Sequence, residues 1–171
     1  MKEHTGVITF QGNPLTLVGN EVKVGGKAPD FMLLDSDLTP VSLADFEGKT
    51  LIIAVIPSLD TPVCDMETVR FNKEAAAFGD NVRLLTVSMD LPFAQARWRA
   101  AKSADNVTIL SDHKDASFGE AYGVLIKELR LLARVVFIVD GAGIIRYIQM
   151  VKDVASEPDY ADVLAALRAL A

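Results

Sequence analysis

Cysteine is the scarcest reactive residue of this chain, since only one of 171 residues, Cys64, carries a thiol. A single cysteine excludes an internal disulfide framework and fits a reducing compartment. It also excludes the C-x-x-C motif of thiol–disulfide oxidoreductases, because Thr61 and Glu67 stand three residues before and after it. The two histidines, His4 and His113, have no cysteine at metal-ligand spacing and no context as a catalytic base. We therefore expect neither a metal site nor a cysteine hydrolase.

Basic clusters and long apolar runs are missing as well. The formal net charge is −6 and no run of Lys and Arg stands out, so nucleic acid is not an expected partner. The longest apolar run, Leu51–Pro57, is far shorter than the roughly 20 residues that cross a bilayer. The first ten residues lack the apolar centre of a signal peptide. We expect a cytoplasmic protein without membrane contact.

Apolar residues are abundant, and they make up half of the chain. This is enough for the core of one domain over residues 1–171. Gly6–Phe10 and Leu15–Val18 flank a Gly-Asn-Pro turn and predict a hairpin at about 6–18. Leu51–Pro57 lacks polar alternation, which is typical of a strand covered on both faces. Further strands are expected at 31–34, 83–88, 107–110, 134–140 and 144–150. Helices are expected at about 63–78, 92–102, 116–122 and after Pro158. One face of the last helix would carry Tyr160, Val163, Leu164, Leu167 and Leu170.

This order of elements predicts an α/β fold with a central mixed β-sheet flanked by helices. The succession of strands and helices, closed by a strand pair and a terminal helix, is typical of a thioredoxin-like fold with an N-terminal hairpin added. Because one fold serves many functions, the activity has to be argued from particular residues.

Cys64 lies just after the buried strand, in the expected first turn of a helix. The first backbone N–H groups of a helix have no internal partner and, with the helix dipole, they favour negative charge. The thiolate is the nucleophilic form of cysteine, so this position favours reactivity. The alternative is that Cys64 packs as a small hydrophobic side chain, as free cysteines often do.

The neighbours of Cys64 allow two interpretations each. The hydroxyl of Thr61, three residues earlier, can lie beside the sulfur, and it can also cap the helix N-terminus. Pro57 stiffens the loop and can shield the sulfur from water, and it can equally be ordinary punctuation after a strand. These readings are not exclusive.

Pro57, Thr61 and Cys64 form P-x-x-x-T-x-x-C, which resembles the active-site motif of peroxiredoxins. The resemblance extends from about residue 6 to residue 170. Over this range the chain is similar to the bacterial thiol peroxidases, a subfamily of atypical two-cysteine peroxiredoxins. It rests on six segments in the same order: FQGNPLTLVG, PSLDTPVCDMETVRFN, SMDLPFAQARW, AYGVLIKE, LLARVVFIVD and EPDY.

The resemblance implies a role for four residues. Cys64 would be the peroxidatic cysteine, Thr61 would hydrogen-bond the thiolate and the peroxide, and Pro57 would shield the site. Arg134, in LLARVVF, would be the arginine that lowers the energy of the thiolate and holds the peroxide oxygens. The reaction would reduce hydrogen peroxide or an organic hydroperoxide, leave a sulfenic acid on Cys64 and need no cofactor. Without the resemblance, Arg134 would be read as a solvated charge. A homodimer is also implied.

The chain departs from the subfamily at one position. A resolving cysteine is expected in the helix after LPFAQ, and Arg99 stands there. The sulfenic acid would therefore be reduced by an external thiol, either a thioredoxin-like protein or a small thiol. The alternative is a peroxide-sensing redox protein that is oxidised quickly but does not turn over efficiently.

Overall fold

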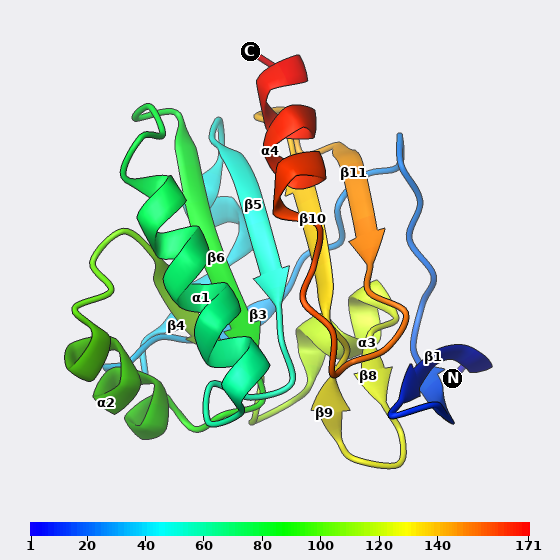
Figure 1. The fold of residues 1–171 in the computed structure, drawn as a ribbon. Helices are drawn as coiled ribbons and strands as arrows, with labels where there is room; N and C mark the ends of the chain where they lie inside the picture. Colours follow the sequence, from blue (N-terminus) through cyan, green and yellow to red (C-terminus); the bar gives the residue numbers. More distant parts are fainter.

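A seven-stranded mixed sheet forms the centre of the computed structural model, which describes residues 1–171 (Figure 1). Its strand order is β11-β10-β5-β6-β7-β3-β4. Only β5, β6 and β7 run parallel to one another, and the other neighbours pair antiparallel, which confirms the mixed sheet. The strands are β3 (Met32–Leu34), β4 (Pro40–Ser42), β5 (Thr50–Val55), β6 (Val82–Ser88), β7 (Thr108–Ser111), β10 (Val135–Val139) and β11 (Ile145–Met150).

The central strand β5 is buried on both faces, as its unbroken apolar run predicts. Leu51, Ile53 and Val55 belong to one core cluster, while Ile52 and Ala54 belong to a second one. This alternation follows from the two-residue period of a strand, which sends successive side chains to opposite faces. The two clusters are the two layers of core on either side of the sheet.

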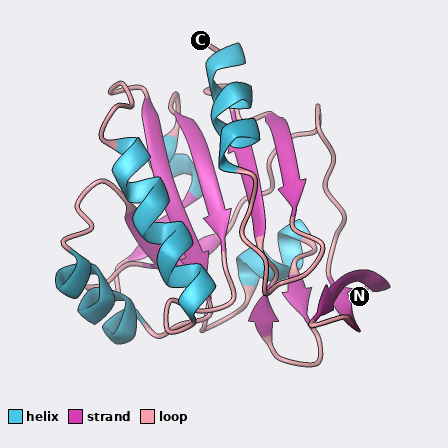
Figure 2. Ribbon diagram, viewed as in Figure 1, coloured by secondary structure: helices cyan, strands magenta, loops and turns pink.

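Helices cover both faces of the sheet (Figure 2). Phe71 of α1 (Pro62–Ala75), Trp98 of α2 (Pro92–Lys102) and Val163 of α4 (Tyr160–Ala169) pack in the cluster of Ile52. Phe118 of α3 (Ser117–Tyr122) packs on the other face. No helix of the protein combines the length and apolar character required to cross a bilayer.

The N-terminal hairpin is present but belongs to a separate sheet. Its strands β1 (Glu3–Phe10) and β2 (Asn13–Val18) continue into β8 (Leu125–Ile126) and β9 (Leu131–Leu132), in the order β1-β2-β8-β9. Ile8 and Leu17 of the hairpin join the same core cluster as α3. The hairpin therefore covers part of one face of the central sheet beside α3.

Several boundaries differ from those expected from sequence. The helix α1 ends at Ala75 rather than near Phe78, because the chain then turns toward β6. Leu170 lies beyond the end of α4 and is exposed, so it is not part of the apolar face. The very short strands β4, β8 and β9 and the 3-10 turn Leu43–Phe46 carry too few residues to produce a periodic pattern.

Candidate active site

Cys64 lies in the first turn of α1, which follows β5 after a short loop. Pro57 is buried in the connecting loop, and Pro62 opens the helix, where a missing N–H costs nothing. The side chain of Cys64 is completely buried and packs in the same core cluster as Leu59. The buried face of the helix consists of Cys64, Glu67, Thr68 and Phe71, at the i, i+3, i+4, i+7 spacing of one helix stripe.

The register of the sheet brings Arg134 to the same edge as the loop that leads to Cys64. β10 runs antiparallel to β5, and Val135 pairs with Val55. Arg134 directly precedes β10, so it lies where β5 ends and the loop begins. Two segments far apart in the sequence therefore meet at one edge of the sheet.

The guanidinium of Arg134 is buried, with a relative exposure of 1%, so it is not a solvated surface charge. Its Nε and Nη2 both donate to the carbonyl of Val154, at 3.1 and 2.6 Å, and its Nη1 donates to Glu67 Oε2 at 3.1 Å. Each terminal nitrogen keeps one further N–H without a protein partner. A fixed cation with two uncommitted donors can hold oxygen atoms that carry developing negative charge.

Glu67 completes a buried ion pair that sequence reasoning missed. It lies one helical turn after Cys64, it is fully buried, and its Oε1 has no hydrogen-bond partner. Burial raises its pKa from 4.5 to about 7, although Arg134 pulls in the opposite direction. The signal was available, because the i+3 spacing from Cys64 puts an acidic residue on the buried stripe of α1.

The side chain of Thr61 does not cap the helix, which was one of the two roles expected for it. It occupies the N-cap position with an extended backbone, but its side chain makes no capping hydrogen bond. Its hydroxyl instead donates to the carbonyl of Ser58 at 2.8 Å, and the residue is exposed. The donor of Thr61 is therefore engaged, and its oxygen remains able to accept a hydrogen bond from the solvent side. The structure does not join Thr61 to the buried pair of Arg134 and Glu67.

The loop before Cys64 is fixed by Asp90, which follows β6. The hydroxyl of Ser58 donates to Asp90 Oδ1 at 2.6 Å, and the backbone N–H of Leu59 donates to Oδ2 at 2.8 Å. The hydroxyl of Ser88 donates to the same Oδ2 at 2.7 Å. One carboxylate thus ties the end of β6 to the loop that follows β5.

Arg99, at the position expected for a resolving cysteine, lies on α2 and is exposed. Its Nε donates to the carbonyl of Ala104 at 3.1 Å, just beyond the end of the same helix. The neighbouring Trp98 faces α1 and donates its indole N–H to Asp65 at 2.7 Å. The side chain at position 99 therefore bonds the backbone just after α2, and it supplies no thiol.

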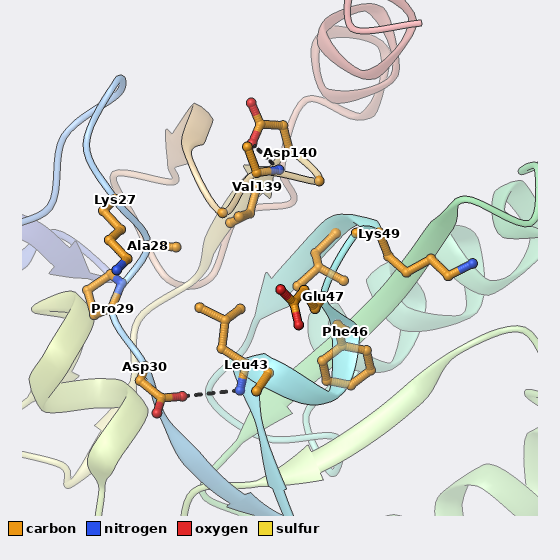
Figure 3. A pocket seen from close by; sticks show the side chains of 16 residues that line it. Lys27, Ala28, Pro29, Asp30, Leu43, Phe46, Glu47, Lys49, Val139 and Asp140 are labelled. Atoms are coloured by element: carbon orange, nitrogen blue, oxygen red, sulfur yellow. Dashed lines mark hydrogen bonds between the residues drawn. The ribbon is translucent and has the colours of Figure 1, made fainter.

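The largest cavity lies at the end of the sheet where β5 begins, and Figure 3 shows side chains that line it. Its volume is about 680 Å³, and Lys27, Leu43, Lys49 and Asp140 are among its lining residues. It adjoins the first residues of β5, whereas Cys64 follows the last ones. Cys64 lines neither this cavity nor the next, of about 400 Å³. No group of three or more His, Cys, Asp or Glu side chains is arranged to hold a metal ion.

Comparison with known proteins identifies the family of the chain. The sequence profile described as the AhpC/TSA family matches residues 24–148. A protein named thiol peroxidase from Bacillus subtilis is 57% identical over 163 residues, which cover 95% of this chain and 97% of the relative. A thiol peroxidase from Halalkalibacterium halodurans is 54% identical over 162 residues, which cover 95% of this chain and 97% of that protein.

A solved structure shows the same fold over almost the whole chain. The crystal structure of a peroxiredoxin-like protein from Aquifex aeolicus superposes with a TM-score of 0.91 at 40% identity, and the match covers 98% of this chain and 99% of that one. The chain therefore belongs to the AhpC/TSA family and, within it, to the bacterial thiol peroxidases, and it is an enzyme of the peroxidase class.

Proposed function

We propose that this enzyme reduces hydrogen peroxide and organic hydroperoxides through a sulfenic acid on Cys64, which an external thiol then reduces. The observation that carries the proposal is the buried ion pair between Arg134 and Glu67, because Glu67 lies one helical turn after Cys64, the only thiol of the chain. A buried guanidinium with two uncommitted N–H groups is suited to an anionic reaction, and no other cysteine can perform it.

In the first half-reaction, the thiolate of Cys64 attacks the terminal oxygen of the hydroperoxide. A sulfur–oxygen bond forms, the oxygen–oxygen bond breaks, and the leaving alkoxide or hydroxide takes up one proton to become an alcohol or water. The free N–H groups of Arg134 and the N-terminal dipole of α1 stabilise the negative charge that develops on the leaving oxygen.

Thr61 and Pro57 have supporting roles in this proposal. The hydroxyl of Thr61 is fixed as a donor to Ser58, so its oxygen is oriented to accept a hydrogen bond from the hydroperoxide. Pro57 is buried beside the reacting loop and has no N–H of its own, so it excludes water without competing for the thiolate.

In the second half-reaction, an external thiol attacks the sulfenic acid of Cys64, releases water and forms a mixed disulfide. A second thiol then frees Cys64 and leaves as a disulfide. A thioredoxin-like protein or a small thiol can supply both electrons. Because Cys64 is completely buried, the exposed segment around Thr61 and Pro62 has to move before the reductant reaches the sulfur.

We also propose a homodimer and a cytoplasmic location. Four large apolar side chains near the active-site loop are exposed by 42 to 65%, and such surfaces favour burial against a partner. They are Met66 and Val69 on α1 and Leu91 and Phe93 at the start of α2. A free thiol without a disulfide partner fits a reducing compartment. Sedimentation velocity of the enzyme and of a Phe93→Ser variant tests the dimer.

A peroxide sensor is the second candidate function, favoured by the full burial of Cys64 together with the lack of a resolving thiol. Such a protein is oxidised quickly, but its sulfenic acid persists. It predicts that peroxide consumption stops after one equivalent even in the presence of thioredoxin, dithiothreitol or glutathione.

Stopped-flow oxidation tests the first half-reaction. Trp98 packs in the same cluster as Cys64, so its fluorescence reports the state of the thiol. Reduced protein mixed with hydrogen peroxide should react by a second-order process orders of magnitude faster than a free thiol, and mass spectrometry should find one added oxygen on Cys64. A rate equal to that of a free thiol would overturn the proposal, and Cys64→Ser supplies the blank.

A further inference from the structure

The segment between β11 and α4 holds the side chain of Arg134 in place. After β11 the chain folds back, so that the backbone N–H of Val151 donates to the carbonyl of Arg134 at 3.0 Å. Three residues later, the carbonyl of Val154 accepts from both Nε and Nη2 of the same arginine. Two of the three protein hydrogen bonds of the guanidinium therefore end on one backbone oxygen, and the position of that oxygen sets the direction of the remaining N–H groups.

Asp153 fixes the turn that carries the Val154 carbonyl. Its Oδ1 accepts from the backbone N–H of Ala155 at 2.9 Å, and its own carbonyl accepts from the N–H of Ser156 at 3.0 Å. The carboxylate thus spans the peptide that follows Val154. A side chain that bonds the backbone two residues ahead is the usual way in which aspartate defines a turn.

The N-terminal hairpin lies beside the segment that follows β11 (Figure 1), and it binds Asp153 from the other side. The hydroxyl of Thr9 donates to Asp153 Oδ2 at 2.7 Å, and the N–H of Gly12, in the hairpin turn, donates to the same oxygen at 3.1 Å. The backbone of Thr9 also bonds Lys152 and Val154, at 2.8 and 3.0 Å. These hydrogen bonds lower the pKa of Asp153 to about 2, so the carboxylate stays charged at any working pH.

We infer that Asp153 is a positioning residue for Arg134 and that the hairpin acts on the reaction through it. The hairpin holds Asp153, Asp153 fixes the Val154 carbonyl, and this carbonyl aims the guanidinium toward the edge of the sheet where Cys64 lies. This inference rests on the proposed role of Arg134 in peroxide reduction. It gives the hairpin, an addition to the thioredoxin-like core, a part in the chemistry.

The turn at Asp140 offers a matched control. Asp140 accepts from two backbone N–H groups, of Ala142 and Ile144, and from the side chain of Arg146. It therefore fixes a turn with the same kind of network as Asp153, and its pKa is also lowered, chiefly by the Ile144 N–H. It lies beside the large cavity at the far end of the sheet, without contact to Arg134.

The test compares stopped-flow rate constants for oxidation of Cys64 by hydrogen peroxide. Asp153→Ala should lower the rate constant about five- to tenfold, while Asp140→Ala should change it less than twofold. Thr9→Val, which removes one hydrogen bond and keeps the side-chain shape, should lower it about threefold, and Thr9→Ser should restore it. If Asp153→Ala fails to fold, the rate constant of Thr9→Val still tests the inference.

A double-mutant cycle separates positioning from general destabilisation. In an Arg134→Met background, Asp153→Ala should change the rate constant less than twofold, because the group that it positions is gone. Equal losses with and without Arg134, equal losses at Asp140 and Asp153, or a Thr9→Val rate constant like that of wild type would overturn the inference. A slow wild-type enzyme would instead overturn the proposed function itself.

Discussion

The two ends of the central sheet differ in how deeply their charged side chains are buried. At one end, where β5 finishes, Arg134 and Glu67 are withdrawn from water with relative exposures of 1% and 0%. At the other end, Arg146 and Asp140 form a similar pair, at 2.7 Å, but the arginine is 46% exposed. The second end also holds the larger cavity. The proposed reaction therefore lies at the end where a charged guanidinium is buried, which is expensive in desolvation energy, and not at the end with the larger cavity.

Removal of the thiol should have the largest effect. Cys64→Ser should abolish peroxide consumption completely, because no second cysteine can take over. The change replaces sulfur by oxygen in a fully buried site, so the fold should persist. Peroxide consumption followed with excess dithiothreitol measures the effect, and residual turnover above the buffer rate would place the reactive group elsewhere.

Removing the buried cation should have the next largest effect. Arg134→Met should lower the rate constant for oxidation of Cys64 by about 10²-fold, because the N–H donors that we propose stabilise the leaving oxygen are lost. The same change at the other end, Arg146→Met, should alter it less than twofold. Similar losses at both ends would show that buried and exposed arginines do not differ in function.

The pKa of Glu67 predicts a pH dependence of stability. The unfolded chain releases this proton near pH 4.5, whereas the folded protein keeps it up to about pH 7. Between these values the folded state binds more protons, so the free energy of unfolding falls as the pH rises. Asp112, with a pKa raised to about 6 by burial, contributes in the lower part of this window.

Between pH 6 and 7, Glu67 should therefore account for a fall of about 1 kcal/mol in the free energy of unfolding. Urea unfolding at the two pH values measures it. Glu67→Gln, which keeps the shape and cannot titrate, should remove the fall. If the variant keeps the wild-type slope, another group titrates in this window.

The smallest effect is expected in the large cavity. Lys27→Ala removes an exposed side chain from its wall, far from the end of β5 that precedes Cys64. The rate constant for peroxide should stay within twofold of the wild-type value in the same stopped-flow assay. A loss comparable to that of Arg134→Met would make the cavity part of the active site.

Much of the fold could be predicted from the sequence because the apolar residues of its longer strands and helices follow a clear pattern. The unbroken run of β5 and the helical spacing of α1 placed Cys64 at a strand-to-helix junction, where the structure has it. Strands of two residues, such as β8, carry no period and could not be found. The capping role of Thr61 was wrong because a hydroxyl three residues after Ser58 can bond that carbonyl instead.

The partners of the site were harder to find than the thiol. Arg134 was identified through the family resemblance, since nothing local distinguishes a buried arginine at a strand's start from a solvated one. Glu67 was missed although its spacing from Cys64 offered a signal, because its partner Arg134 comes from a distant strand. Asp153 was missed because it is bound by a hairpin from the opposite end of the chain.

In the proposed cycle, a hydroperoxide oxidises Cys64 and a thiol from outside the chain reduces it. Peroxide consumption by reduced enzyme, measured with and without an external thiol, tests this most directly. We predict that consumption stops after one equivalent per chain without thiol, and that with thioredoxin or dithiothreitol it continues until two thiol groups have been oxidised for each peroxide. Continued turnover without an added thiol, or the same consumption by Cys64→Ser, would contradict the account.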